Sequence, residues 1–183
     1  MNSFGTIYEP YNTVEIKEII KDKTLKAKDK TSLISQFLNE NPHQINLLVN
    51  EAKIFKGSDK ATYIEAIEHA TLANPMLCTP ECFNFAIFSL ADKAPRVKWE
   101  SARVIANTAH LFHDELTEAI INLLANTEHK GTVVRWSAAQ ALSKIVSLNT
   151  THNAQLVPAL KTVCANEEKA SIQKIYIAAL KHF

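Results

Sequence analysis

The chain has 183 residues, of which 46% are hydrophobic and 21% are charged, so it can bury a sizeable core and is not a disordered or collagen-like chain. Lysine and arginine number 20 against 19 aspartates and glutamates, and this balance argues against general binding to nucleic acid or to an anionic membrane. Gly5, Gly57 and Gly131 lie too far apart for the glycine-rich loops that cradle nucleotide phosphates, which excludes those motifs.

Segment 1–30 is expected to hold an N-terminal extension and a first helix. It has neither the basic region nor the apolar region of a secretory signal, and no stretch of the chain approaches the roughly 18 apolar residues of a membrane span. Cys78, Cys82 and Cys164 are an odd number of cysteines, which favours free thiols in a reducing compartment. We therefore expect a cytoplasmic protein without a membrane partner.

Long stretches of the chain repeat apolar residues at three- and four-residue spacing, and few alternate apolar with polar residues. The pattern predicts an all-α fold. Asn41-Pro42 and Thr79-Pro80 have the residues that begin helices, whereas Gly57 and Gly131 mark helix ends. We expect about ten helices joined by short loops.

A two-helix unit recurs along the chain. VKWESARVIA from Val97 aligns with VRWSAAQALS from Val134 and with IQKIYIAALK from Ile172, at nearly equal spacings. Such a unit cannot bury its apolar face alone, so its copies must stack into one solenoid domain. We predict a degenerate repeat at 31–58, repeats at 59–93, 94–130 and 131–169, and a terminal half-repeat at 170–183.

Two cations interrupt the apolar face of the repeated helix. Lys98 and Arg135 occupy equivalent positions in the middle of that face, where an unpaired charge would be very costly. The polar residues that end the preceding helices are the candidate partners. We expect Asp92 to pair with Lys98 and Asn126 to pair with Arg135.

These segments resemble the HEAT-repeat family and the related armadillo-type solenoids. The family pattern "LxD, short loop, V[RK]xxAAxAL" is found in LADKAPRVKWESARVI and in LLANTEHKGTVVRWSAAQAL. The resemblance implies a right-handed α-α superhelix of about four to five two-helix repeats, in which the acidic and basic residues form an inter-repeat ladder. It also implies a binding scaffold, although the motif defines a fold better than a function.

In HEAT-like arrays the second helix of each unit lines the concave surface, so its outward stripe is the expected partner site. The stripe consists of Glu81, Asn84, Phe88, Glu115, Glu118, Asn122, Gln155 and Thr162. Its three glutamates favour a basic protein or peptide. Phe88 is either an exposed aromatic anchor for that partner or a residue that packs against a neighbouring helix.

Trp99 and Trp136 occupy equivalent positions at the edge of the polar face of their helices. We expect them to pack between repeats, because tryptophan is usually well buried and the neighbouring helices are rich in alanine. A base-stacking platform for nucleic acid is the alternative interpretation.

No metal, cofactor or catalytic site is expected. Cys78 with Cys82, and His110 with His113, are only pairs, whereas a zinc site needs four ligands held together. No serine, cysteine or threonine lies in a recognisable activated turn. The chain therefore does not have the motifs of an enzyme.

We predict a non-enzymatic scaffold or adaptor that binds a protein or peptide on its concave face. The alternative is a protein similar to the alkylpurine DNA glycosylases built from HEAT-like repeats, whose groove is cationic; a bilin-lyase-like HEAT protein is a third interpretation. The last helix carries Ile175 and Ala178 on a side where earlier copies are polar. We therefore expect either a monomer, whose open end is tolerated or covered by its own N-terminus, or a weak homodimer through the C-terminal helix.

Overall fold

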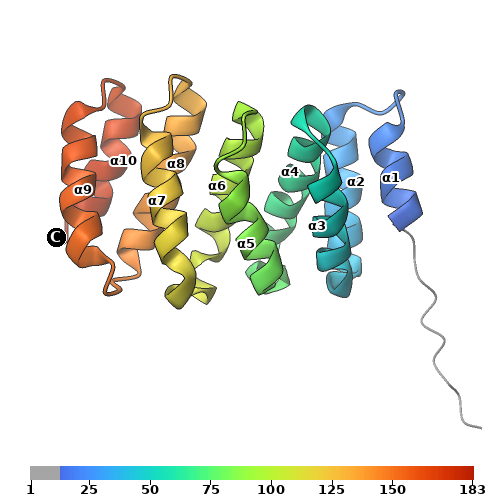
Figure 1. Ribbon diagram of the computed structural model, residues 1–183, viewed down its shortest axis with the longest axis horizontal. Coiled ribbons are helices and arrows are strands. Elements are labelled where there is room, and N and C mark those ends of the chain that lie inside the picture. The colour runs from blue at the N-terminus through green and yellow to red at the C-terminus, as the bar shows by residue number, and fades with distance from the viewer. Residues whose placement is uncertain (1–12) are drawn as a thin grey trace, which may run out of the picture.

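The computed structural model describes residues 13–183, and in this range the chain forms ten α-helices, four short 3-10 helices and no strand (Figure 1). This confirms the prediction of an all-α fold. The α-helices are α1 (Thr13–Lys21), α2 (Ala27–Glu40), α3 (Ile45–Ile54), α4 (Gly57–Ala73), α5 (Pro80–Ser89), α6 (Pro95–Thr108), α7 (Leu116–Thr127), α8 (Thr132–Ser147), α9 (Asn153–Asn166) and α10 (Ala170–Leu180). The 3-10 helices are η1 (Pro42–Gln44), η2 (Pro75–Leu77), η3 (Ala109–Leu111) and η4 (His113–Glu115).

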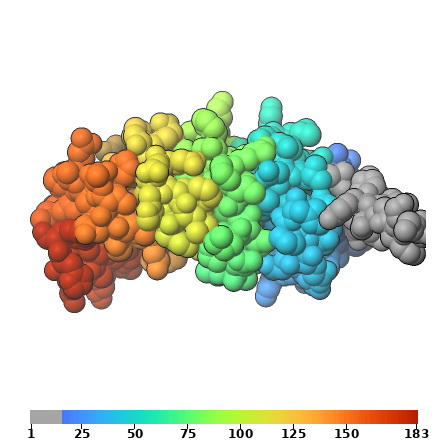
Figure 2. All heavy atoms as spheres, turned by 90° about the horizontal axis from the view of Figure 1, so that it is seen from below, coloured from blue at the N-terminus to red at the C-terminus, as the bar shows by residue number. Residues whose placement is uncertain are grey.

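The helices stand in two rows that run along the long axis of the molecule (Figure 1). We call α2, α4, α6, α8 and α10 the first-helix row, and α3, α5, α7 and α9 the second-helix row, which faces the viewer in Figure 1. Figure 2 shows the repeats following one another, with α10 at one end of the stack. None of the helices that the structure describes has the length and apolar character needed to cross a membrane.

The predicted repeats can be compared with the observed helix starts. First-row helices begin at Gly57, Pro95, Thr132 and Ala170, beside the predicted boundaries at 59, 94, 131 and 170. The helix of the degenerate repeat begins at Ala27, inside the segment that was predicted as an extension. Residues 1–12 of that extension lie outside the described part of the chain.

Local signals explain where two of these helices begin. The Thr79 hydroxyl accepts a hydrogen bond from the Cys82 amide at 3.1 Å, and Pro80 occupies the first position of α5. Gly57 has a φ of +58°, which a residue with a side chain rarely adopts, and it forms the turn between α3 and α4. Gly131 directly precedes α8.

Alanine allows the first-helix row to pack closely. Seven alanines of α4, α6 and α8 have at most 1% of their surface exposed: Ala61, Ala66, Ala70, Ala102, Ala138, Ala139 and Ala141. Small side chains let helix axes approach each other. Consequently α2, α4, α6 and α8 contact one another extensively, whereas α5, α7 and α9 contact one another sparsely.

An inter-repeat ladder runs along the loops at one end of the helices, but its pairs differ from those expected. Lys60 pairs with Asp92 at 2.9 Å, Lys98 donates to the Asn126 side chain at 3.0 Å, and Arg135 pairs with Glu167 at 3.0 Å. Each cation of a first helix thus reaches forward to the end of the second helix in its own repeat. Lys98 and Arg135 were expected to reach backward, to Asp92 and Asn126.

Stacking explains the difference. Each cation lies between the end of the preceding second helix and the end of the following one, and the preceding end offers it backbone carbonyl groups. Lys98 donates to the Leu90 carbonyl at 2.8 Å, and Arg135 donates to the His129 carbonyl at 3.0 Å. Asp92 is already bound by Lys60 and by the Ala94 amide at 2.9 Å.

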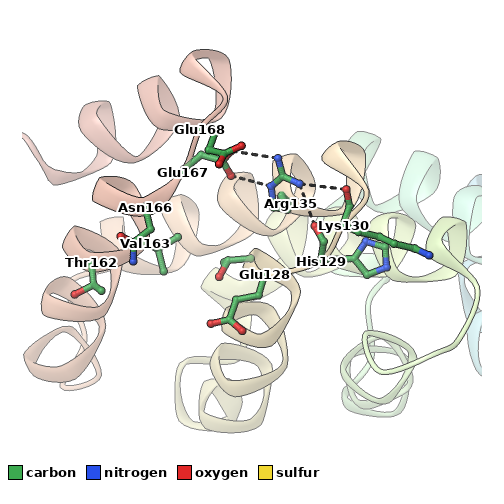
Figure 3. Close-up of a pocket in the computed structure, with 10 residues that line it drawn as sticks. Glu128, His129, Lys130, Arg135, Thr162, Val163, Asn166, Glu167 and Glu168 are labelled. Carbon is green, nitrogen blue, oxygen red and sulfur yellow. Dashed lines mark hydrogen bonds and ion pairs between the residues drawn. The ribbon is translucent and has the colours of Figure 1, made fainter.

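Figure 3 shows the last and strongest step of the ladder, where the Arg135 guanidinium lies between Glu167 and the carbonyl groups of residues 129 and 130. Burial alone would raise the pKa of Glu167, but hydrogen bonds from Arg135 and from the Lys169 amide outweigh it and hold this pKa below its usual value. The same contact with Glu167 raises the pKa of Arg135. The pair is therefore fully ionised at neutral pH.

The two forms of the ladder should respond differently to removal of the cation. Arg135→Met should lower the free energy of unfolding by about 2–4 kcal/mol, because it leaves the largely buried Glu167 carboxylate without a cation and with only backbone hydrogen bonds, such as that from the Lys169 amide. Lys98→Met should cost less than about 1 kcal/mol, because the groups that accept its hydrogen bonds are neutral and Asn126 still donates to the Leu90 carbonyl at 3.0 Å. The Asp92 carboxylate, which also attracts Lys98, keeps its ion pair with Lys60. Urea unfolding of both variants measures the difference; equal losses would contradict this account of the ladder.

Candidate functional site

The predicted stripe lies on the second-helix row. Phe88 on α5 has 73% of its surface exposed, so it does not pack against a neighbouring helix. The other stripe residues are also exposed or half-buried, on α5, η4, α7 and α9: Glu81, Asn84, Glu115, Glu118, Asn122, Gln155 and Thr162. Side chains on the whole stripe are therefore accessible to a partner.

Three stripe residues meet around one cleft, which we call the Phe88 cleft. It has a volume of about 440 Å³, lies between α3, the start of α4 and α5, and is lined by Lys53, Lys60, Glu81, Asn84, Phe85, Phe88 and Ser89. Phe85 is 6% exposed and forms part of the apolar floor. The exposed Phe88 ring thus borders a hollow that is large enough for a side chain of a partner.

Charges in the Phe88 cleft are largely compensated by the protein itself. Lys53 on α3 binds Glu81 at 2.8 Å, and the Lys60 ammonium, which pairs with Asp92, lies 5.5 Å from the centre of the Phe85 ring. Glu81 therefore adds little negative potential to the cleft. The Phe88 cleft would therefore bind a partner through its shape more than through its charge.

The remaining stripe residues do not join this cleft. Gln155 lines a separate hollow of about 270 Å³ between α7 and α9, beside Ile120 and Ile121, and Thr162 lines another at the end of α9 (Figure 3). Glu118 accepts a hydrogen bond from Asn122 at 3.3 Å. Among the described residues, Glu115 and Glu118 form no ion pair, so the negative potential of the stripe lies at the start of α7.

The spacing of the two rows bears on which side is concave. Units that lie close together on one side and fan apart on the other bend the stack toward the close side. Since the first helices pack closely and the second helices do not (Figure 1), we infer that the first-helix row lies on the inner side of the bend. On this geometry the stripe faces outward, contrary to the expected concave placement, and its clefts open where the second helices separate.

A buried ionic cluster on the first-helix row was not predicted. Arg103 on α6 binds Glu68 of α4 at 3.0 Å and Glu100 at 3.2 Å, although these carboxylates are 2% and 3% exposed. Asn107 donates to the Glu68 backbone carbonyl at 3.1 Å, and the Trp99 indole N–H donates to Glu100 at 2.6 Å. The sequence signal was weak, because a polar stripe of a helix is usually a solvated face.

The two tryptophans differ in their surroundings. Trp99 is half-buried and held by its hydrogen bond to Glu100. Trp136, at the equivalent position of α8, is 41% exposed. Packing between repeats, which was expected for both rings, therefore leaves much of Trp136 uncovered.

The cysteines and histidines do not form a metal cluster in the described part of the chain, where no three His, Cys, Asp or Glu side chains are grouped for a metal ion. Cys78 and Cys82 are both buried. A hydrogen bond between their thiols holds the pKa of Cys78 below its usual value, and the same contact together with burial raises the pKa of Cys82. His110 and His113 are exposed.

Comparison with known proteins supports the fold. No protein-family model matches the chain, and no curated protein matches its sequence. Its structure is similar to the designed armadillo repeat protein YIII(Dq)4CqI, with a TM-score of 0.66 and 17% identity over 91% of this chain and 79% of that chain. It is also similar to the designed armadillo repeat protein YIII(Dq.V1)4CPAF in complex with peptide (KR)4, with a TM-score of 0.69 and 18% identity over 92% and 80% of the chains. These likenesses show an α-solenoid of the armadillo or HEAT type.

The buried cluster predicts a pH dependence that belongs to Glu100. Burial raises the pKa of Glu100 above its ordinary value of 4.5, although Trp99 and Arg103 oppose the rise. Below both the ordinary and the raised pKa, the carboxyl is protonated in the folded and unfolded chain alike. As the pH rises from the ordinary pKa through the raised one, the folded state must come to hold a buried charge. The free energy of unfolding therefore falls over this pH range.

Glu100→Gln removes this titration and serves as the reference. The free energy of unfolding of the natural protein, minus that of the variant, should fall as the pH rises from about 4.5, by about 1.4 kcal/mol for each unit by which the pKa is raised. Urea unfolding of both proteins between pH 4 and 8 measures this difference. A difference that stays constant, or that grows with pH, would show that Glu100 is not the titrating group.

Proposed function

We propose that this protein is a non-enzymatic repeat scaffold that binds a peptide segment of a partner protein at the Phe88 cleft. The observation that carries the proposal is the exposure of Phe88, which leaves 73% of a large aromatic side chain in water beside a cleft of about 440 Å³. An exposed aromatic ring beside a hollow is typical of the residues that dominate binding energy at protein interfaces.

The shape of the cleft favours a side chain of the partner that is apolar. Phe85 and Phe88 border the hollow, and its charged residues Lys53 and Glu81 already bind each other. A charged group entering this space would have to displace an existing ion pair, whereas an apolar side chain would cover Phe88 and leave that pair intact.

A preference for basic residues in the partner would come from the next helix. Glu115 and Glu118 lie at the start of α7, both exposed and without an ion pair among the described residues. A peptide that runs from the Phe88 cleft along the second-helix row would pass them. One of the similar designed armadillo proteins was solved in complex with peptide (KR)4, which is consistent with binding of basic peptides by this type of solenoid.

Phe88→Ala tests the proposal directly. Phage-displayed random peptides selected on the immobilised protein supply the probe, and fluorescence anisotropy of the selected peptides measures Kd. Loss of the ring should weaken binding at least about tenfold, as for an interface hot spot. Glu115→Lys with Glu118→Lys should weaken the binding of those selected peptides that carry lysine or arginine.

Ile177→Ala is the matched control, because Ile177 is a half-exposed apolar residue on α10 at the far end of the stack. It should leave Kd unchanged. Selection of no peptide, or equal affinity of the natural protein and the Phe88 variant for every selected peptide, would contradict binding at the Phe88 cleft.

A further inference from the structure

A second groove lies in the other row of helices, at the C-terminal end of the stack. It has a volume of about 440 Å³ and runs between α8 and α10, so we call it the α8–α10 groove. Ile175 and Ala179 lie in its floor and pack partly against the core, and Ala178 beside them is exposed. The groove is therefore apolar at its base and open to solvent.

The charge around this groove has one sign. Neither α8 nor α10 contains an aspartate or a glutamate, and the groove is lined by Lys144 in the last turn of α8 and by Lys174 in α10. Among the described residues neither lysine forms an ion pair. Arg135, the other cation of α8, is bound to Glu167 and does not line the groove.

In earlier repeats of the same row, the arginines of α6 are neutralised by carboxylates. Arg96 binds Glu65 at 2.6 Å, and Arg103 binds both Glu68 and Glu100. The two cations of the α8–α10 groove thus differ from the arginines of α6, because the described part of the protein provides no carboxylate for them. Uncompensated cations on opposite walls of an apolar groove attract an anionic partner.

Ser143 adds a polar group that has no partner within the described part of the protein. Its hydroxyl oxygen is buried and forms no hydrogen bond there, and the residue lines the groove next to Lys144 on α8. Buried polar groups are normally hydrogen-bonded, and one that is not costs free energy.

We propose that the α8–α10 groove binds an acidic peptide segment of a partner protein, in which an apolar side chain is flanked by carboxylates. The apolar side chain would cover Ile175 and Ala178, and the carboxylates would reach Lys144 and Lys174. Nucleic acid fits these observations less well, because it draws its affinity from many phosphate contacts and this groove offers two cations. This site is independent of the Phe88 cleft and of the function proposed for it.

Three labelled peptides of equal length serve as probes: (Glu-Leu-Asp-Ala)3, its neutral counterpart (Gln-Leu-Asn-Ala)3 and its basic counterpart (Lys-Leu-Arg-Ala)3. In anisotropy titrations at low salt, the acidic peptide should bind at least about tenfold more tightly than the neutral one. Lys144→Glu with Lys174→Glu should abolish that advantage. Equal binding of the acidic and neutral peptides would overturn the proposal.

Lys23→Glu with Lys28→Glu is the matched control, because these lysines are exposed at the other end of the stack and the net charge changes equally. It should leave binding of the acidic peptide within about twofold, and an equal loss in both double variants would overturn the proposal as non-specific attraction. Ala178→Trp fills the groove without changing a charge and should also block the acidic peptide. Phe88→Ala should not affect it, which separates this test from that of the Phe88 cleft.

Two other occupants have distinct outcomes. Steeply salt-dependent binding of duplex DNA that is lost in the Lys144 and Lys174 double variant would replace the peptide with nucleic acid. A dimer in light scattering that the same double variant dissociates would assign the groove to a second copy of this chain. Either result would overturn the proposed acidic peptide.

Discussion

The close packing of alanine between first helices is the constraint on which the rest of this structure depends. Ala66, Ala102 and Ala138 are fully buried in that row and let its helices approach one another. The second helices contact one another sparsely and carry larger buried groups, such as Phe83 of α5. The Phe83 ring stacks on that of Phe112, in the segment between η3 and η4, with centres 4.4 Å apart. One row is therefore compact and the other open, and the Phe88 cleft follows from this difference.

The close packing of the first helices also limits where a charged side chain can lie without a partner. A cation that is buried in the compact row is stable only when a carboxylate, an amide or a carbonyl group reaches it. Arg103 meets this requirement with two buried glutamates, and Lys98 with Asn126 and the Leu90 carbonyl. Glu115 and Glu118 at the start of α7, and Lys144 and Lys174 beside the α8–α10 groove, form no ion pair among the described residues. Both sets lie on surfaces proposed for a partner, which they can select by charge.

Periodicity in the sequence predicted the helices, because they depend on spacing along the chain. It also indicated Asp92, Lys98, Asn126 and Arg135 as ladder residues, but it missed Lys60 and Glu167. The ladder pairs depend on spacing between repeats. Lys98 lies near Asp92 in sequence, but the folded stack brings its ammonium within 3.0 Å of the Asn126 side chain, and Lys60 binds Asp92. The part played by Lys60 was open to prediction, since it precedes Lys98 by the same interval that separates Arg135 from its counterpart in α10. Which row lies on the inner side of the bend depends on the size of the side chains packed within both rows. The periodicity of a single helix does not contain this information.

The last repeat links the ladder to the α8–α10 groove. Arg135 and Trp136 of α8 align with Gln173 and Lys174 of α10, one repeat further along the chain. Gln173 donates to the Cys164 carbonyl at 3.1 Å, so the ladder position of α10 is satisfied without a charged partner. In α8 the cation stands at the ladder position, where Glu167 neutralises it. In α10 the cation is Lys174, one position later, where it lines the groove and forms no ion pair among the described residues.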